Sequence, residues 1–449
     1  MENIKHIHFL GIGGVSQSAL AVILKSKGYK VSGSDKTESK TTKLLKQKNI
    51  DICINGLSNQ LNNADLVVYS VAVPNDDKEM VYAKTLGKKV ISRAEMLGLL
   101  AKEYKNIISI AGSHGKTTTT GMIARVFIEA GLNPTVHIGG ELTDYQTNAI
   151  VGGEEYFITE ACEYYDSFLQ LESDVSVILN IQSDHLDYFK TVKRLNNSFL
   201  KFANNTKKGG LVVFYGDDKV CKKNYKSISV SYSCENNGVL QARNIREYIR
   251  GKYSFDCFFL GKKLANIKLG VYGKHNINNA LASIIVGLKY GIDIKIMKKA
   301  LFEYKGVKRR FEDYGRVFGV SIVHDYAHHP TEIKATISLA KRVSKGDVYV
   351  VFQPHTYSRT LSLLDEFKTC FKGAKEVLVY KVYPAREDRS QGIDEKELAK
   401  ELGSVGEQAN SFDNYGEMKR YLIEKTKKND MILVLGAGDI ESFCDYFKN

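Results

Sequence analysis

Short apolar runs alternate with longer amphipathic stretches along most of this chain. Runs rich in β-branched residues, such as residues 106–111 (NIISIA) and 176–181 (SVILNI), have the length and composition of buried strands. The stretches 16–28 and 330–343 carry apolar residues at helical spacing, and the second opens with Pro330 in its first turn. Alternation of this kind predicts parallel sheets flanked by helices, which is an α/β fold.

The length of the chain indicates more than one domain, and we divide the pattern into three regions. Its 449 residues exceed what one hydrophobic core holds, which is about 250–300 residues. We place the domain boundaries so that the regions are 1–105, 106–308 and 309–449. Between about residues 217 and 269 the pattern becomes β-rich and irregular, which indicates an antiparallel addition to the central domain.

Composition narrows the class of protein. The net charge is +13, but Lys and Arg are spread along the chain, which suits a solvated surface and an enzyme that handles polyanions such as nucleotides. Because no long basic block occurs, we expect no nucleic-acid partner. No apolar run approaches the roughly 18 residues of a membrane helix. The N-terminus enters a strand pattern directly, so we expect no membrane insertion and a cytoplasmic location. The seven scattered cysteines form no C-x-x-C pair and are read as reduced thiols.

The first glycine-rich loop, GIGGVS, joins an N-terminal strand to a helix. A dinucleotide fold expects G-x-G-x-x-G here, with an acidic residue about 20 positions later. Gly11 and Gly13 match this pattern, Ser16 replaces the third glycine, and Asp35 stands near the acidic position. The pattern predicts a Rossmann-like domain. It leaves open a nicotinamide or flavin site, another nucleotide-diphosphate ligand, or only a tight turn.

The second glycine-rich loop, GSHGKT, follows the strand at residues 106–111. Ile110 stands where a standard phosphate loop has its first glycine. Gly112 and Gly115 nevertheless free the backbone to fold around phosphate oxygens, while Lys116 supplies a cation and Thr117 a hydroxyl suited to Mg²⁺. The alternative is a helix start that Ser and Thr side chains only cap. The order of strand, loop, lysine, hydroxyl and helix favours a parallel-sheet domain like that of P-loop ATPases.

This short loop resembles that of the Mur ligases and of folylpolyglutamate synthetase, which are ATP-dependent amide-bond ligases. Further stretches of the same family follow in order and carry, respectively, Glu160 (TEACEYYDSF), His185 (NIQSDHLDYF), Asn276 (GKHNINNA), Arg310 (GVKRRFED) and Asp325 (VHDYAHHPTE). The resemblance spans nearly the whole chain. It implies three domains, with Rossmann-like domains at both ends.

Three stretches, GIGGVS, DYAHHPTE and FQPHTYSRT, are similar to the family members that act on UDP-N-acetylmuramate and L-alanine. The resemblance therefore implies these two substrates, with ATP and Mg²⁺, in peptidoglycan precursor synthesis and so in cell-wall biogenesis. ATP would phosphorylate the substrate carboxylate, and an amino group would attack the resulting acyl phosphate. Cys162 stands where the family leads us to expect Asp, and HTYSRT where HRYTRT is commoner.

The resemblance also implies roles for single residues. The catalytic set is Lys116, Glu160, His185, Asn276, Arg310 and Asp325. The ATP-binding set is Gly112, Ser113, His114, Gly115, Lys116, Thr117, Thr118, Asn276, Arg310 and Asp325. The UDP-sugar set is Gly11, Gly13, Gly14, Ser16, Asp35, Ser70, Ala72 and Arg93. Substrate or amino-acid contacts are Tyr326, His328, His329, His355 and Arg359, with His328 and His329 also open to a structural role. The metal ligands are Thr117, Glu160 and His185.

Other functions stay open at this point. A nicotinamide-dependent oxidoreductase would use the first loop, but it leaves Lys116 and Glu160 without a role. The positive charge leaves room for a nucleic-acid-binding ATPase. Within the family, another amino acid or a preformed peptide is an alternative acceptor. We expect a monomer or a homodimer.

Overall fold

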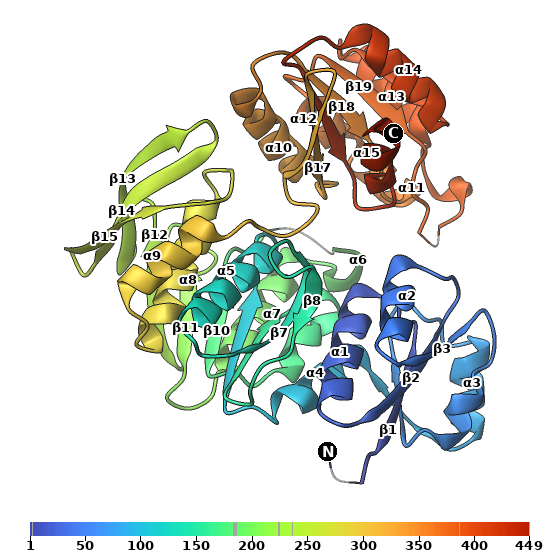
Figure 1. Cartoon of the computed structure of the whole chain (residues 1–449), viewed down its shortest axis with the longest axis vertical. Helices are drawn as coiled ribbons and strands as arrows, with labels where there is room; N and C mark the ends of the chain where they lie inside the picture. The colour runs from blue at the N-terminus through green and yellow to red at the C-terminus, as the bar shows by residue number, and fades with distance from the viewer. Residues whose placement is uncertain (2, 183–185, 223–224, 236, 386, 449) are drawn as a thin grey trace. The chain divides into compact units, whose positions relative to one another are not determined.

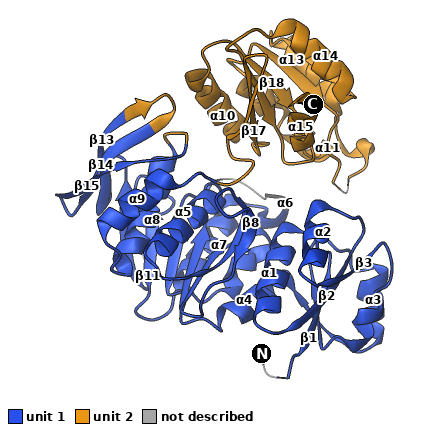
Figure 2. Ribbon diagram, in the orientation of Figure 1, with its two compact units in different colours: residues 1–246, 253–271, 275–306 blue, residues 247–252, 272–274, 307–449 orange. Residues whose placement is uncertain are grey.

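The computed structural model describes residues 1, 3–182, 186–222, 225–235, 237–385 and 387–448. These residues form three α/β domains, each built on its own sheet, so the predicted fold class is confirmed (Figure 1). The N-terminal and central sheets belong to one compact unit. The C-terminal sheet, together with the short segments 247–252 and 272–274, forms a second unit (Figure 2).

The N-terminal domain is a parallel five-stranded sheet in the order β3-β2-β1-β4-β5, as expected of a Rossmann-like domain. Its elements are β1 (His6–Leu10), α1 (Val15–Ser26), β2 (Lys30–Asp35), α2 (Lys40–Gln47), β3 (Asp51–Ile54), η1 (Asn59–Asn63), β4 (Leu66–Tyr69), α3 (Lys78–Thr85), β5 (Lys89–Ser92) and α4 (Arg93–Ala101). Strand β1 is buried along its full length, and apolar residues of α1 pack in the same core. The order of the strands reverses between β1 and β4, and open α/β sheets bind ligands at such a position.

The central domain is built on a ten-stranded sheet in the order β15-β14-β13-β12-β11-β10-β6-β9-β7-β8. Its strands are β6 (Asn106–Ala111), β7 (Thr135–Leu142), β8 (Thr147–Ile150), β9 (Tyr156–Glu160), β10 (Val175–Ile178), β11 (Leu211–Tyr215), β12 (Ile228–Ser233), β13 (Leu240–Ile249), β14 (Lys252–Phe259) and β15 (Lys262–Lys268). Its helices are α5 (Lys116–Glu129), η2 (Tyr164–Gln170), α6 (Leu186–Phe189), α7 (Val192–Asn204), α8 (Asn276–Lys289) and α9 (Ile294–Glu303).

This central sheet is mixed, which corrects the prediction of a parallel one. The pairs β7–β8 and β14–β15 are antiparallel. Their connections, residues 143–146 and 260–261, are far shorter than the dozen or so residues that a parallel crossover needs. The antiparallel addition expected between residues 217 and 269 is confirmed for β14–β15, whereas β12 and β13 pair in parallel.

The C-terminal domain is a six-stranded sheet in the order β16-β17-β21-β18-β19-β20. Its elements are β16 (Glu312–Val317), β17 (Val320–Asp325), α10 (Pro330–Val343), β18 (Val348–Phe352), α11 (Tyr357–Ser362), α12 (Leu364–Cys370), β19 (Glu376–Tyr380), η3 (Arg389–Gln391), α13 (Glu395–Ser404), β20 (Ala409–Phe412), α14 (Tyr415–Lys425), β21 (Met431–Leu435) and α15 (Glu441–Lys448). Five strands are parallel, as in a Rossmann-like sheet, and β16 adds an antiparallel edge. The turn into β17 has positive φ at Phe318 and Gly319, which suits a two-residue hairpin.

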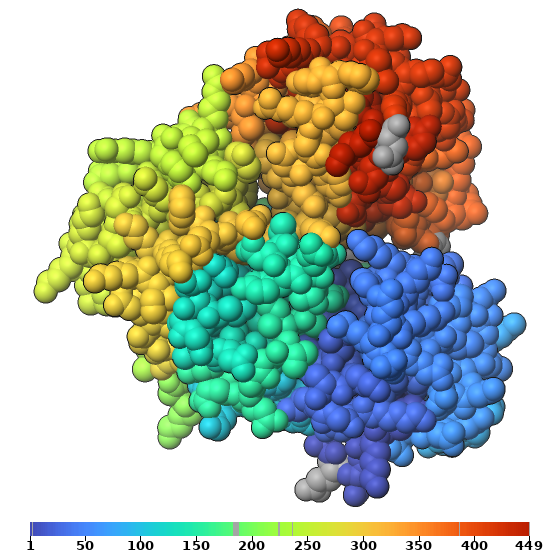
Figure 3. Space-filling view, in the orientation of Figure 1, coloured from blue at the N-terminus to red at the C-terminus, as the bar shows by residue number. Residues whose placement is uncertain are grey.

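The sheets position the loops of the site. Strand β6 lies between β9 and β10, so the loop that follows it emerges beside the ends of both neighbours. Within the first unit, α1 packs against β7 and β8, and the blue and teal surfaces meet in the space-filling view (Figure 3). No helix among the described residues is long and apolar enough to cross a bilayer.

Candidate active site

The loop between β6 and α5 has the backbone of a phosphate cradle. Gly112 and Gly115 have φ of +147° and +86°, values that favour glycine. A Cβ atom at Gly115 would also lie 2.8 Å from the side-chain oxygen of Asn279. Helix α5 begins after Gly115 with no side-chain cap, so its N-terminus presents amide groups and a positive dipole end. The residues present therefore fit a bound phosphate.

Asn180, which follows β10, holds the loop in place. Its side-chain oxygen accepts from the His114 amide at 2.9 Å, and its amide group donates to the His114 carbonyl at 2.9 Å. The Ser113 hydroxyl accepts from the Gln182 amide at 2.9 Å. These bonds tie the loop to the neighbouring strand end, so its shape is set before a ligand arrives. Sequence reasoning gave Asn180 no role and placed it inside the strand predicted at residues 176–181, whereas β10 ends at Ile178.

Lys116 lies inside the loop and pairs with a buried acid. Its ammonium group donates to the Gly112 carbonyl at 2.5 Å and to the two carboxylate oxygens of Glu163 at 3.1 and 3.0 Å. Burial opposes the charge on Lys116, but the pairing with Glu163 outweighs it and raises the pKa above its usual value. The lysine is therefore a cation. Glu163 was not predicted, and its only signal in the sequence is its position three residues after Glu160.

Glu160 ends β9 on the next strand of the sheet. Its carboxylate accepts from the Gly139 amide at 2.6 Å, and a Cβ atom on Gly139 would come within 3.0 Å of both its oxygens. Thr117, the second residue of α5, supplies a hydroxyl near the same loop. Carboxylate and hydroxyl oxygens are ligands that fit Mg²⁺. His185 lies outside the described residues, among which no cluster of three or more His, Cys, Asp or Glu could hold a metal ion.

Asn276 is connected to the phosphate loop through the side chain of Asn279. It is the first residue of α8 and accepts a 2.8 Å hydrogen bond from the Asn279 side-chain amide. Asn279 in turn stands against Gly115. The structure therefore brings the predicted Asn276 close to the phosphate loop, and it adds Asn279 of the same motif, GKHNINNA, as the residue between them.

The first glycine-rich loop is built at the carboxyl ends of β1, β2 and β4. Gly11 follows β1 with φ of +76°, and the Gly13 amide donates to the Asp35 carboxylate at 2.8 Å. Gly14 precedes α1, which has no side-chain cap. Ser70, after β4, accepts from the Ala72 amide at 3.2 Å and donates its own amide to the carbonyl of β1's last residue. The predicted UDP-sugar residues thus gather at the switch point of the sheet.

Ser16 connects this loop to the central domain of the same unit. Its hydroxyl lies 3.1 Å from the Arg93 guanidinium, which donates to it, and 2.8 Å from His137 Nε2. His137 Nδ1 lies 3.0 Å from the Thr159 hydroxyl, beside Glu160. Burial lowers the pKa of His137 to about 3, with a further contribution from Arg93, so the imidazole is neutral. Sequence reasoning missed His137, since a lone histidine in a strand carries no motif.

In the second unit, Asp325 ends β17 and is buried. Its carboxylate accepts from the Phe311 and Ala327 amides, each at 2.8 Å. Burial raises its pKa to about 6, against the opposing effects of Arg310 and these two amides. The Arg310 guanidinium lies 5.2 Å from the centre of the Tyr326 ring. Asp325, Arg310 and Tyr326 therefore form one group within this unit.

A second group in this unit combines His328, His355 and Arg359. The rings of His328 and His355 are 5.8 Å apart, and burial lowers the pKa of both, that of His355 to about 4. The positive charge of Arg359, on α11, acts on both histidines in the same direction. His329 instead caps α10 and accepts from the Thr331 amide. This hydrogen bond gives His329 a structural part at the start of α10, and its predicted contact with the substrate stays a prediction.

Family models match all three domains of the chain. Residues 6–105 match the catalytic domain of the Mur ligase family, residues 110–287 the Mur ligase middle domain, and residues 309–438 the Mur ligase glutamate ligase domain.

Individual relatives match this chain over nearly its full length. UDP-N-acetylmuramate–L-alanine ligase from Clostridium botulinum (strain Loch Maree) is 42% identical, over 99% of this chain and 98% of its own length. The crystal structure of UDP-N-acetylmuramate–alanine ligase from Thermotoga maritima has a TM-score of 0.85 at 29% identity, over 99% and 98% of the two chains. A MurF ligase from Thermotoga maritima, solved in complex with ADP, shares the fold at 19% identity with a TM-score of 0.64, over 100% and 98% of the chains.

Proposed function

Because this chain belongs to the Mur ligase family, we propose that it joins L-alanine to UDP-N-acetylmuramate with the hydrolysis of ATP. The observation that carries this proposal is the 42% identity, over 99% of the chain, to a ligase of that name. The phosphate loop around Lys116 supports it independently, because an amide-forming ligase must bind and orient a triphosphate. The product would enter peptidoglycan precursor synthesis.

Each domain would contribute one part of the reaction. Residues 1–105 bind the UDP-sugar at the first glycine-rich loop, where Arg93 and Ser16 face the central domain. Residues 106–308 bind ATP on the loop around Lys116. Residues 309–449 bind the amino acid and complete the ATP site with Arg310 and Asp325. This division rests on where the motifs lie in the three sheets.

The chemistry would run in two steps. An oxygen of the substrate carboxylate attacks the γ-phosphorus of ATP and displaces ADP, which gives an acyl phosphate. The amino nitrogen of L-alanine then attacks the acyl carbon, loses a proton, and displaces phosphate. Lys116 and the amides at the start of α5 hold the β- and γ-phosphates in place, because phosphoryl transfer depends on positioning and charge stabilisation.

Thr117 and Glu160 are the residues that would hold Mg²⁺, together with His185 from the resemblance. Bound there, the ion neutralises phosphate charge as it develops. In the second unit, Arg310 would contact the phosphates and Asp325 the ribose, while Asn276 in the first unit would contact the adenine. Tyr326, His328, His355 and Arg359 would contact the amino acid or the sugar substrate. We also infer a cytoplasmic location, where ATP is made, and a monomer or homodimer.

The test is phosphate release by the purified protein with UDP-N-acetylmuramate, ATP and Mg²⁺ across a panel of amino acids. We expect release to depend on all three and to be fastest with L-alanine. Faster release with another amino acid would move the chain to a different specificity within the family. No release with any amino acid, or a fluorescence change on adding NADH, would contradict the proposal.

A further inference from the structure

The buried partner of the phosphate-loop lysine has no role in the reaction described so far. The Glu163 side chain is only 2% exposed, and it faces the Lys116 ammonium group at 3.0 Å. The carbonyls of Gly112 and Ser113 lie on the same ammonium group, at 2.5 and 3.4 Å. In the absence of nucleotide, the charge that this loop offers to phosphate is therefore already neutralised by a carboxylate of the chain itself.

Glu163 reaches this position through an unusual turn. It immediately precedes η2, and its carbonyl accepts from the Asp166 amide at 2.9 Å. Tyr165 and Asp166 both have left-handed backbone, with φ of +55° and +53°. Two consecutive residues with side chains in this region are costly, and such a conformation persists only where the surroundings impose it. The turn therefore has to be held by contacts elsewhere.

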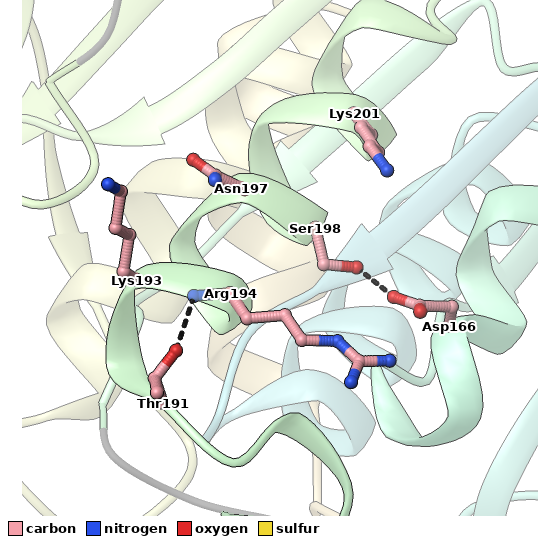
Figure 4. A pocket seen from close by; sticks show the side chains of 7 residues that line it. All are labelled: Asp166, Thr191, Lys193, Arg194, Asn197, Ser198 and Lys201. Carbon is pink, nitrogen blue, oxygen red and sulfur yellow. Dashed lines mark hydrogen bonds between the residues drawn. The ribbon is translucent and has the colours of Figure 1, made fainter.

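Those contacts come from Asp166 itself. Its carboxylate accepts from the Ser198 hydroxyl of α7, as the dashed line in Figure 4 shows, and from the Tyr188 hydroxyl at 2.7 Å. Ser198 is buried, so this bond is shielded from water. The Arg194 guanidinium lies 4.9 Å from the centre of the Tyr188 ring and covers the same corner. Two hydroxyl donors thus fix the turn that presents Glu163 to the loop.

The pair poses an electrostatic problem for ligand binding. The Glu163 carboxylate is buried beside the loop, so phosphates bound there would face the same ammonium group as this carboxylate. Repulsion between charges a few ångströms apart is substantial at the low effective dielectric of a buried site. Burying an ion pair also gives little net stability compared with neutral groups, so stability alone does not explain its presence.

We propose that Glu163 is a positioning residue for Lys116, holding its ammonium group inside the loop between turnovers and yielding it to the incoming phosphates. The carboxylate keeps the lysine ordered and lowers the affinity for nucleotide, which favours the release of ADP. In this role Glu163 acts through Lys116, the residue with which its carboxylate pairs. This inference rests on the proposed function, since it requires the loop to bind a nucleotide.

The test compares nucleotide affinity in wild type and Glu163→Gln, measured by calorimetry with ADP, once in EDTA and once with Mg²⁺. The glutamine keeps the shape and can still accept from Lys116, but it carries no charge. We expect E163Q to bind ADP about fivefold more tightly than wild type in EDTA, because the competing charge is gone. In turnover with Mg²⁺, both KM for ATP and kcat should fall, since binding tightens while the lysine loses its orientation.

Two further variants separate charge from structure. Glu163→Asp keeps the carboxylate, so its ADP affinity should stay closer to that of wild type than to that of E163Q. Ser198→Ala removes one anchor of Asp166 and should tighten ADP binding about twofold. Glu376→Gln is the matched control: Glu376 is a buried acid of β19 bonded to Asn410 and Tyr421, and its loss should leave ADP affinity unchanged.

The outcomes distinguish the two proposals. If wild type binds no adenine nucleotide, the proposed function fails. If wild type binds ADP but E163Q binds it equally or more weakly in EDTA, only the role of Glu163 is overturned. If E163D behaves like E163Q, charge is not the cause and the role is also overturned. Should E163Q not fold, S198A carries the test, and unchanged ADP affinity in S198A would count against the anchored turn.

Discussion

The two glycine-rich loops look alike in sequence but differ in where the cation stands and in which group the neighbouring acid contacts. In the first loop the acid Asp35, at the end of β2, accepts from the backbone amide of Gly13, and the cation Arg93 comes from α4 and donates to Ser16. In the second loop the cation Lys116 belongs to the loop, and the acid Glu163 comes from another segment. Both loops leave the start of a helix without a side-chain cap.

This difference teaches which ligand each loop suits. Uncapped helix starts and open glycines are common to all phosphate loops, so they do not discriminate between ligands. An ammonium group within the loop adds charge where β- and γ-phosphates need it. An acid at the end of the second strand, such as Asp35, places an acceptor near a ribose, as in dinucleotide folds. We therefore infer that the second loop takes the triphosphate and the first takes the nucleotide sugar.

The largest effect should follow from Lys116→Ala. We expect ligation to fall by at least about 10²–10³-fold, because the ammonium group that stabilises the phosphates is lost. UDP-sugar binding should stay largely intact. The change also leaves Glu163 buried without its partner, which costs about 3–5 kcal/mol of stability, so assays belong below the melting temperature. Phosphate release and calorimetry measure the two effects, and near-normal turnover would refute the assigned role.

The same small substitution in both loops sharpens the comparison. At Gly115 an added methyl group meets Asn279 and a backbone of φ +86°, and at Gly13 it would lie 2.7 Å from the Asp35 carboxylate. We expect Gly115→Ala to weaken ATP binding about tenfold or more and to spare the UDP-sugar. Gly13→Ala should do the reverse. Each variant is the control for the other. An equal loss of affinity for both ligands in either variant would contradict the assignment of one ligand to each loop.

The smallest effect concerns His137, which links the first loop to the central domain. Its folded-state pKa of about 3 lies below the usual 6.5, so the folded state binds fewer protons than the unfolded state between these values. Its contribution to stability is thus present above pH 6.5 and lost as pH falls toward 3. His137→Gln should reduce the pH slope of the unfolding free energy by up to ~1.4 kcal/mol per pH unit in this window.

Denaturant titrations at pH 4 to 7 measure that slope. His324 in the second unit also has a pKa lowered to about 3 by burial. His324→Gln therefore tests whether the effect is general or particular to the link at Ser16. An unchanged slope in His137→Gln would show that this histidine is not held neutral by the contact between the domains.

Much of the fold could be predicted from periodicity. Helix α10 begins at Pro330, which the sequence places in the first turn of a helix. The antiparallel pair β7–β8 was not predicted, because its direction depends on a short connection rather than on the apolar pattern. The edge strand β16 also escaped prediction: its residues are mostly polar and alternate in exposure, as edge strands often do.

The candidate site shows the same division. Lys116, Glu160 and Asn276 stand in motifs that read along the chain, and the structure brings them to one end of the central sheet. Glu163 and His137 belong to no such pattern. Glu163 reaches Lys116 only through a left-handed turn at Tyr165, and His137 matters only because two domains meet. Long-range contacts of this kind leave no periodic trace in a single sequence.

The most direct test of the central claim is a crystal structure of the protein with a non-hydrolysable ATP analogue and UDP-N-acetylmuramate bound together. The account predicts the triphosphate on the amides that follow Gly115, with Lys116 on its β- and γ-phosphates, and the uridine diphosphate at Gly11–Gly14. A triphosphate lodged at the first loop, with the turn at Gly115 empty, would contradict it.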